Sequence, residues 1–248
     1  MHEREKGDMD YAFYLRMLAS LSHLGVRELG LGYFGEPFLC RWLPEAVGHA
    51  KRDGGFERVF VVTNGRLATP ERVRDCIEAG LDSLEFSANY AGPDQFHYVS
   101  GAPEQDFWKL EVNLTAARIV RDEVEARTGH RCALVASSLR FDEQQPARMR
   151  GALERIRASA DEHRWRPVRG PFGARAPVPC APLFEEAHIS CEGKLLACPF
   201  DHQRRFEMGD LNCETFVEAW HGGRFGALRA AHLAGDTRGT ACEGCAAR

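Results

Sequence analysis

The chain has 248 residues and a nearly balanced charge, with 32 Lys and Arg against 36 Asp and Glu. Hydrophobic residues make up 44% of it, as in a globular protein with a real core, and the balanced charge gives no electrostatic basis for binding nucleic acid or a membrane. No apolar run reaches the length of a membrane span, and the charged segment 1–10 does not resemble a signal peptide. We therefore expect a cytoplasmic protein with no nucleic-acid or membrane partner.

Helical and extended patterns alternate through the first two thirds of the chain. Apolar residues at helical spacing predict a first helix from Asp10 to Leu24, and further helices are predicted over residues 38–49, 70–79, 103–127 and 145–163. Strands are predicted over residues 26–32, 59–62, 81–87 and 132–138. Because this alternation is typical of βα units, the sequence predicts an α/β fold built on a parallel sheet.

Residues 164–179, rich in Arg, Pro and Gly, are the one stretch typical of a linker. We therefore predict two domains, a βα domain over residues 1–165 and a small hairpin-plus-helices domain over residues 166–248.

The chain contains nine cysteines, which in a reducing compartment favour metal binding over disulfides. Twelve residues separate Cys180 from Gly193, four separate Gly193 from Cys198, and Cys242 and Cys245 form a C-x2-C pair. The Glu192-Gly193 dipeptide predicts a hairpin turn between two β-prone segments, 188–190 and 194–196. Four thiols on a hairpin and a C-x2-C knuckle are a donor set that suits either an iron–sulfur cluster or a structural zinc ion.

The five remaining cysteines are expected outside this donor set. Cys40 and Cys76 fall in predicted helices and Cys132 in a predicted strand, so we expect buried, inert thiols at all three positions. Cys191 on the hairpin and Cys213 further along are candidates for alternate ligands.

The C-terminal spacing C-x12-G-x4-C followed by C-x2-C resembles the SPASM or shorter twitch extension of radical S-adenosylmethionine (SAM) enzymes. Segments 198–201, 209–211 and 219–229 fit the same pattern, reading CPFD, GDL and AWHGGRFGALR. The resemblance implies that one auxiliary [4Fe-4S] cluster is ligated by Cys180, Cys198, Cys242 and Cys245.

The segment from Gly32 to Pro37 follows a predicted strand, at the end where parallel βα folds bind their ligands. Taken alone, it is an ordinary βα turn capped by a carboxylate. With segments 61–65, 79–84 and 86–87 it resembles the radical SAM barrel, a partial (βα) parallel barrel. The resemblance implies that Gly35, Glu36 and Pro37 hold the amino group of SAM.

In that family, later strand ends hold the ribose and adenine of SAM. Carried to this sequence, the resemblance implicates Thr63, Asn64, Ser87, Asn89 and Ser137. For each of these five, the alternative is a strand-end polar residue that satisfies backbone groups.

The sequence departs from the family at one point. Radical SAM enzymes carry C-x3-C-x2-C after their first strand, and this sequence has no cysteine before Cys40. The first strand and cluster loop are therefore absent from it, through a start assigned too far downstream, a truncation or degeneration. We expect that the 248-residue chain does not cleave SAM.

The resemblance implies chemistry by a 5'-deoxyadenosyl radical, such as oxidation of a small molecule or modification of a peptide, fed by an electron donor such as flavodoxin or ferredoxin. Two alternatives remain open: a non-catalytic [4Fe-4S] protein for electron transfer or partner binding, and a structural four-cysteine zinc protein.

Overall fold

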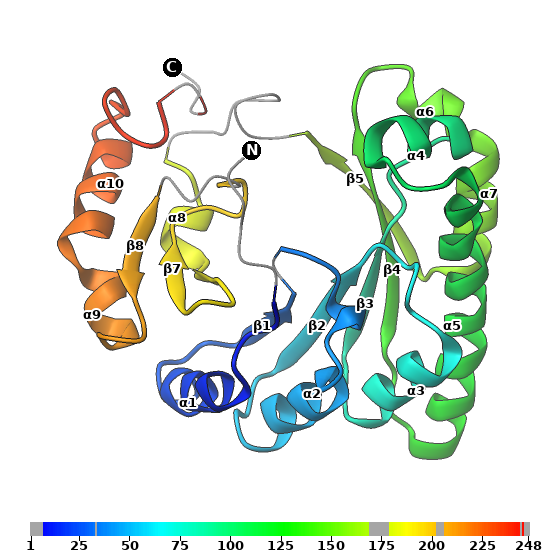
Figure 1. The fold of residues 1–248 in the computed structure, drawn as a ribbon, viewed down its shortest axis with the longest axis horizontal. Helices are drawn as coiled ribbons and strands as arrows, with labels where there is room; N and C mark the ends of the chain where they lie inside the picture. The colour runs from blue at the N-terminus through cyan, green and yellow to red at the C-terminus, as the bar shows by residue number, and fades with distance from the viewer. Residues whose placement is uncertain (1–6, 33, 169–178, 202–205, 244, 246–248) are drawn as a thin grey trace. The chain divides into compact units, whose positions relative to one another are not determined.

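The protein is described by a computed structural model that covers residues 7–32, 34–168, 179–201, 206–243 and 245, and it forms two compact units (Figure 1). Residues 22–167 form one, here the βα unit. Residues 1–21 and 168–248 form the other, here the cysteine-rich unit. These units are defined by how tightly their residues pack, whereas a domain is a part that can fold by itself. The predicted domain limits of 1–165 and 166–248 therefore stay a prediction.

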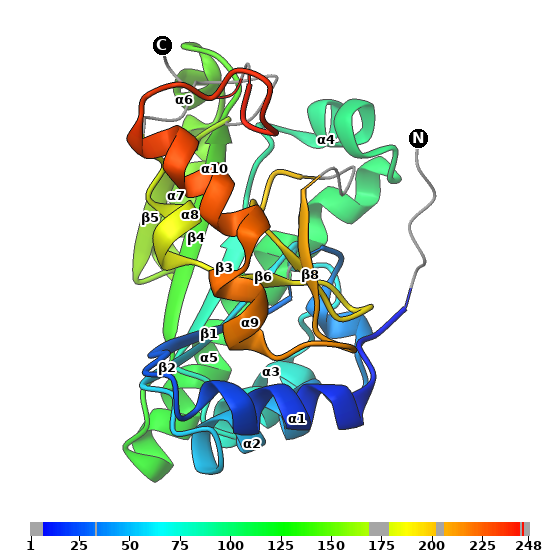
Figure 2. The same cartoon turned by 90° about the vertical axis from the view of Figure 1, so that its left-hand side faces the viewer.

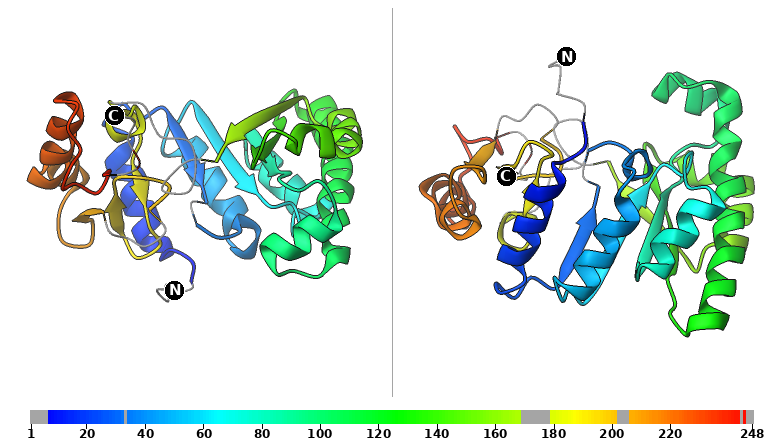
Figure 3. Two further views of the ribbon diagram at one scale, coloured as in Figure 1. Left: turned by 90° about the horizontal axis from the view of Figure 1, so that it is seen from above. Right: turned by 60° about the horizontal axis from the view of Figure 1, so that its bottom comes forward.

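A five-stranded parallel sheet with the order β1-β2-β3-β4-β5 is the centre of the βα unit. Its strands are β1 (Glu28–Leu31), β2 (Arg58–Thr63), β3 (Ser83–Ser87), β4 (Ala133–Arg140) and β5 (Glu162–Pro167). The helices are α2 (Leu43–Arg52), α3 (Pro70–Glu78), α4 (Pro93–Ser100), α5 (Phe107–Thr128), α6 (Gln145–Arg148) and α7 (Arg150–Ser159). Helices α2, α3, α5 and α7 pack side by side along the sheet (Figures 1 and 3).

The predicted parallel α/β fold is confirmed, and its core follows from the strand pattern. Val59 and Val61 on β2 and Leu84 and Phe86 on β3 are each 0% exposed. Val61 lies opposite Leu84 in the register, so these side chains share one face of the sheet.

Three predictions of helices in this unit were wrong in part. The helix predicted over residues 38–49 is a 3-10 helix at Pro37–Leu39 followed by α2, because Pro44 lacks the N–H that a helix interior requires. The helix predicted over 103–127 opens as a 3-10 helix at Glu104–Asp106, and α4 before it was missed.

The helix predicted over 145–163 ends at Ser159, and Glu162–Pro167 is strand β5. Strand β5 pairs in parallel with β4 and alternates exposed Glu162, Arg164 and Arg166 with half-buried His163 and Trp165. The linker predicted over 164–179 is therefore wrong at its start, and residues 169–178 lie outside the described residues.

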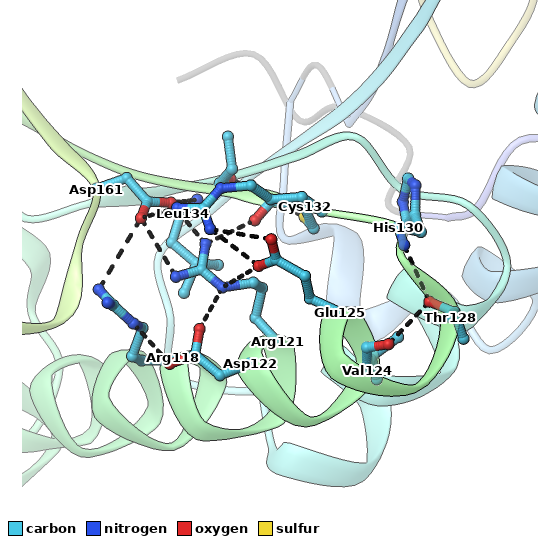
Figure 4. Close-up of polar contacts among 12 residues, drawn as sticks. Arg118, Arg121, Asp122, Val124, Glu125, Thr128, His130, Cys132, Leu134 and Asp161 are labelled. Atoms are coloured by element: carbon cyan, nitrogen blue, oxygen red, sulfur yellow. Dashed lines mark hydrogen bonds and ion pairs between the residues drawn. The ribbon is translucent and has the colours of Figure 1, made fainter.

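A buried guanidinium group joins α5 to the sheet (Figure 4). The Arg121 side chain is 0% exposed and donates to Asp161 Oδ2 at 2.7 Å, to Asp122 Oδ1 at 2.7 Å and to the Cys132 carbonyl at 3.0 Å. Asp161 in turn accepts from the Leu134 backbone N–H at 2.8 Å. Because an unpaired buried charge is costly, the Arg121 guanidinium is paired with the carboxylates of Asp161 and Asp122.

The cysteine-rich unit is built on a three-stranded antiparallel sheet, β6-β7-β8. Its strands are β6 (His188–Ile189), β7 (Lys194–Leu196) and β8 (Glu207–Asp210), and its helices are α1 (Tyr11–Leu21), α8 (Pro182–Glu185), α9 (Phe216–His221) and α10 (Gly223–Leu233). Helices α9 and α10 pack against β8 (Figure 2).

The hairpin predicted around Glu192-Gly193 is confirmed as β6–β7. Gly193 adopts φ +80°, and a Cβ there would lie 3.0 Å from the Phe13 ring and 2.7 Å from Asn212 Nδ2, so this turn requires glycine. Strand β8 was not predicted. The first helix begins where predicted, with the Asp10 carboxylate accepting from the Phe13 N–H at 2.7 Å.

No helix in the described ranges combines the length and apolar character needed to cross a membrane.

Candidate functional site

Four cysteines from three parts of the cysteine-rich unit line one cavity. Cys180 precedes α8, Cys198 follows β7, and Cys242 and Cys245 lie in the turn after α10. The cavity has a volume of about 50 Å³ and is otherwise lined by Pro182, Leu183, Ala197, Pro199, Phe200 and His232. The fold therefore gathers the donor set that the sequence singled out.

Two thiols in this cavity, those of Cys198 and Cys242, favour their neutral form. Burial raises the pKa of Cys198 to about 11 and that of Cys242 to about 12, and the neighbouring Cys180 and Cys245 add to the shift of each. A backbone N–H already points at one sulfur, since Phe200 N–H donates to Cys198 Sγ at 3.3 Å. Because metals bind thiolates, loading this site must release protons.

The chemistry of the cavity fits a metal centre. Its four thiols and the apolar side chains around them enclose about 50 Å³. Among the described residues, no three His, Cys, Asp or Glu side chains lie close enough to hold one metal ion. A zinc ion draws its thiolates to about 2.3 Å from itself, whereas a four-iron cluster holds them further apart. The four thiols, which lie too far apart for one ion among the described residues, are a donor set that an iron–sulfur cluster can use.

His232 is a residue at this cavity that sequence reasoning missed. It is 2% exposed, and its Nδ1 accepts from the Cys180 backbone N–H at 3.3 Å. Its Nε2 is buried and has no hydrogen-bond partner among the residues that the structure describes. A histidine in the last turn of a helix belongs to no recognisable sequence motif. Its position beside the four cysteines follows only from the packing of α10.

The other cysteines do not line the cavity. Cys191 is half-buried at the hairpin turn and Cys213 is exposed beside Asp210, so neither proposed alternate ligand is brought to the four thiols. Cys76 and Cys132 are each 0% exposed, and burial raises the pKa of both to about 12, as expected of inert thiols. Cys40 follows a 3-10 helix and is only partly buried, so the prediction of a buried helical thiol there was wrong.

The segment after β1 forms a tight, carboxylate-capped turn. Glu36 Oε1 accepts from Thr63 Oγ1 at 2.6 Å and from the Phe38 N–H at 3.1 Å, and its Oε2 accepts from the Asn64 N–H at 2.8 Å. Glu36 therefore ties the end of β1 to the end of β2. Gly35 adopts φ +113°, which favours glycine, and Pro37 is buried at the start of the 3-10 helix. Contact of these residues with SAM stays a prediction.

A second cavity, of about 40 Å³, lies in the βα unit where β2 and β3 end. Asn64, Ser87 and Asn89 line it together with the aromatic residues Tyr90, Phe96 and Phe107, which the sequence did not indicate.

The other predicted strand-end residues lie elsewhere, since Thr63 and Ser137 are buried and do not line this cavity. Two of the amides also satisfy backbone groups: Asn64 Oδ1 accepts from the Arg66 N–H and Asn89 Oδ1 from the Leu139 N–H.

Comparisons with known proteins agree with this architecture. Residues 180–246 match the model of the SPASM family, an iron–sulfur cluster-binding domain. The S-adenosyl-L-methionine-dependent 2-deoxy-scyllo-inosamine dehydrogenase of Niallia circulans is 22% identical over 231 residues, 91% of this chain and 75% of that protein. The PqqA peptide cyclase of Streptomyces rochei is 31% identical over 99 residues, 40% of this chain and 26% of its own length.

The solved structures show the same fold. BtrN in an open conformation superposes with a TM-score of 0.59 at 19% identity, covering 96% of this chain and 80% of that one. The enzyme anSMEcpe with bound AdoMet gives a TM-score of 0.56 at 11% identity, covering 91% and 72%. Together with the SPASM match and the four-cysteine cavity, these findings place the chain in the radical SAM superfamily, with a C-terminal SPASM iron–sulfur domain.

Proposed function

We propose that the protein holds one auxiliary [4Fe-4S] cluster on Cys180, Cys198, Cys242 and Cys245 and serves SAM-dependent radical chemistry. The observation that carries this proposal is the convergence of the four thiols on one cavity. Bound there, the cluster would supply one-electron redox chemistry. The protein would orient it through the β6–β7 hairpin and the turn after α10.

For the substrate, we infer a small molecule that is oxidised. The supporting likeness is the dehydrogenase relative, which aligns over 91% of this chain, whereas the peptide cyclase aligns over 40%. BtrN is also known in complex with AdoMet and 2-DOIA, and anSMEcpe with a peptide, so peptide substrates are the competing class.

The SAM site is proposed on the βα unit. Gly35, Glu36 and Pro37 would present the turn after β1 to the amino group of SAM. The strand-end residues Thr63, Asn64, Ser87, Asn89 and Ser137 are the candidates for its ribose and adenine. The position of the turn at the carboxyl ends of parallel strands supports this placement.

Metal analysis tests the cluster. Protein reconstituted without oxygen should be brown, absorb broadly near about 400 nm and contain about four irons per chain. Alanine at any of the four cavity cysteines should remove most of the iron, whereas Cys213→Ala, an exposed control in the same unit, should retain it. A colourless protein with one tightly held zinc would overturn the cluster and leave a structural zinc site.

A second candidate is a non-catalytic [4Fe-4S] protein for electron transfer or partner binding. It is compatible with the four-thiol cavity, which by itself needs no SAM site. Dithionite-reduced protein incubated with SAM separates the candidates by chromatography of 5'-deoxyadenosine. We expect none from residues 1–248 alone, and its formation would show that these residues suffice for SAM cleavage.

A further inference from the structure

His232 presents a buried ring nitrogen at the four-cysteine cavity. The side chain belongs to the last turn of α10, is 2% exposed and lines the cavity. One ring nitrogen, Nδ1, is engaged by the Cys180 backbone N–H at 3.3 Å. The other, Nε2, is buried without a partner among the described residues, so it is available to a group bound in the cavity.

The contact with Cys180 fixes which nitrogen carries the proton. A backbone N–H can only donate, so Nδ1 must act as the acceptor and be unprotonated. An imidazole whose Nδ1 acts as an acceptor carries its hydrogen on Nε2. Nε2–H is therefore a buried hydrogen-bond donor that lacks an acceptor, an arrangement that proteins rarely leave unsatisfied.

Among the described side chains that line the cavity, only sulfur can accept this hydrogen bond. Apart from His232, the side chains that line it are apolar or are the four cysteines. A protonated thiol is a weak acceptor, whereas the thiolates and sulfides of a bound cluster carry negative charge. Four thiolates already supply one ligand for each of four irons, so an additional nitrogen ligand is not required.

We propose that His232 Nε2–H donates a hydrogen bond to a sulfur of the bound cluster and raises its reduction potential, while Nδ1 anchors Cys180. The proposal rests on the proposed cluster on the four cysteines. Hydrogen bonds to cluster sulfurs stabilise the more negative, reduced state, which is how they raise the potential. His232 is thus a positioning residue that acts through the cluster.

Two substitutions separate the roles of the two nitrogens. In His232→Asn, the amide oxygen can replace Nδ1 as acceptor for Cys180, but the side chain is too short to reach the place of Nε2. In His232→Gln, the longer amide restores an N–H donor near the place of Nε2. His221→Asn is the matched control, since His221 is exposed at the end of α9 in the same unit.

The measurement is a redox titration of the reconstituted full chain, followed by electron paramagnetic resonance. We expect His232→Asn to keep about four irons but lower the equilibrium constant for reduction about tenfold, a shift of about 59 mV for a one-electron couple. His232→Gln should recover much of that shift, and His221→Asn should leave the potential unchanged. An unchanged potential in His232→Asn would overturn the proposal.

A second measurement uses the unsubstituted protein, so it does not depend on how a variant folds. In reduced protein with ¹⁵N-labelled histidine, electron–nuclear double resonance should detect one weakly coupled nitrogen and a coupled proton that exchanges in D2O. Absence of both couplings, or a strong coupling from nitrogen bound directly to iron, would refute the hydrogen bond while leaving the cluster intact. Absence of a four-iron cluster in the unsubstituted protein would instead overturn the proposed function itself.

Discussion

The two units surround an arginine guanidinium group with different partners: carboxylates in the βα unit and aromatic rings in the cysteine-rich unit. In the βα unit, Arg121 is fully enclosed and bound by Asp161 and Asp122. In the cysteine-rich unit, Arg229 is stacked over Trp220 and Phe225, with its carbon Cζ 4.1 Å and 4.5 Å from the ring centroids. It donates to the Leu183 and Trp220 carbonyls, and its Nη2 is buried with no partner among the described residues.

The pKa shifts follow from these surroundings. Burial lowers the pKa of Arg121, but its hydrogen bonds to Asp161 and Asp122 outweigh that effect and raise it overall. Burial lowers the pKa of Arg229, with no acid to offset it. The βα unit thus neutralises the Arg121 charge with its own carboxylates, whereas the cysteine-rich unit stacks Arg229 on aromatic rings, with its Nη2 unpartnered among the described residues.

Removal of iron should give the largest effect and test this contrast directly. Since the free energy of ligand binding is also folding free energy, chelation or oxidation should loosen residues 180–245. The βα unit, whose core does not involve the four thiols, should stay folded. Hydrogen exchange with and without cluster should show protection lost in β6–β8 and α10 and kept in β2–β4. Equal loss in both units would contradict the separation.

Arg121→Ala should be the most damaging single change in the βα unit. It removes the buried partner of Asp161 and Asp122, which keep Arg131 and Arg118, and takes a donor from the Cys132 carbonyl. We expect a loss of about 1–3 kcal/mol of unfolding free energy. Urea unfolding measures the loss. The matched control is Arg74→Ala, which removes an exposed pair with Glu123 and should cost about 0–1 kcal/mol. Similar losses of unfolding free energy in both variants would show that the buried network stabilises the fold no more than an exposed ion pair does.

Acid should weaken the same network. Burial raises the pKa of Asp161, but hydrogen bonds from Arg121 and the Leu134 N–H outweigh it and hold that pKa below its ordinary value. A carboxyl with a depressed pKa stabilises the folded state above its unfolded pKa of about 3.9 and loses that contribution as pH falls through the folded pKa.

We therefore expect hydrogen exchange in α5 and β4 to rise as pH drops below about 4. Asp161→Asn should be less stable at neutral pH and show a flatter dependence on acid. Glu154→Gln, which changes an exposed carboxylate on α7, should behave as the unsubstituted protein does. A steep acid dependence that persists in Asp161→Asn would assign the effect to other groups.

Glycine substitutions should give the smallest effects and sharpen the role of the hairpin. Gly193→Ala forces a side chain into a left-handed backbone, at a cost of roughly 1–2 kcal/mol, and sets its Cβ 2.7 Å from Asn212 Nδ2. Gly226→Ala, within α10 and facing open space, should stabilise by roughly 0.5–1 kcal/mol. Thermal unfolding and iron content report both, and a stable Gly193→Ala would show that the turn tolerates a side chain.

Features that depend on local chemistry could be predicted from the order of the residues. Strand β2 contains a short apolar run and β3 alternates apolar Leu84 and Phe86 with polar residues, so the parallel sheet could be predicted. Gly193 marks a turn that only glycine fits, so the hairpin could be predicted as well. The spacing of Cys180, Cys198 and the C-x2-C pair also singled out the four thiols that line one cavity.

Only the tertiary structure decided features that depend on contacts between distant residues. Strand β5 reads EHRWRP, with too few apolar residues to show a strand pattern, and its extended form comes from pairing with β4 at the sheet edge. Arg121 meets Asp161 forty positions away, and His232 meets Cys180 fifty-two positions away. No local pattern encodes such pairs, because the packing of whole helices brings them together.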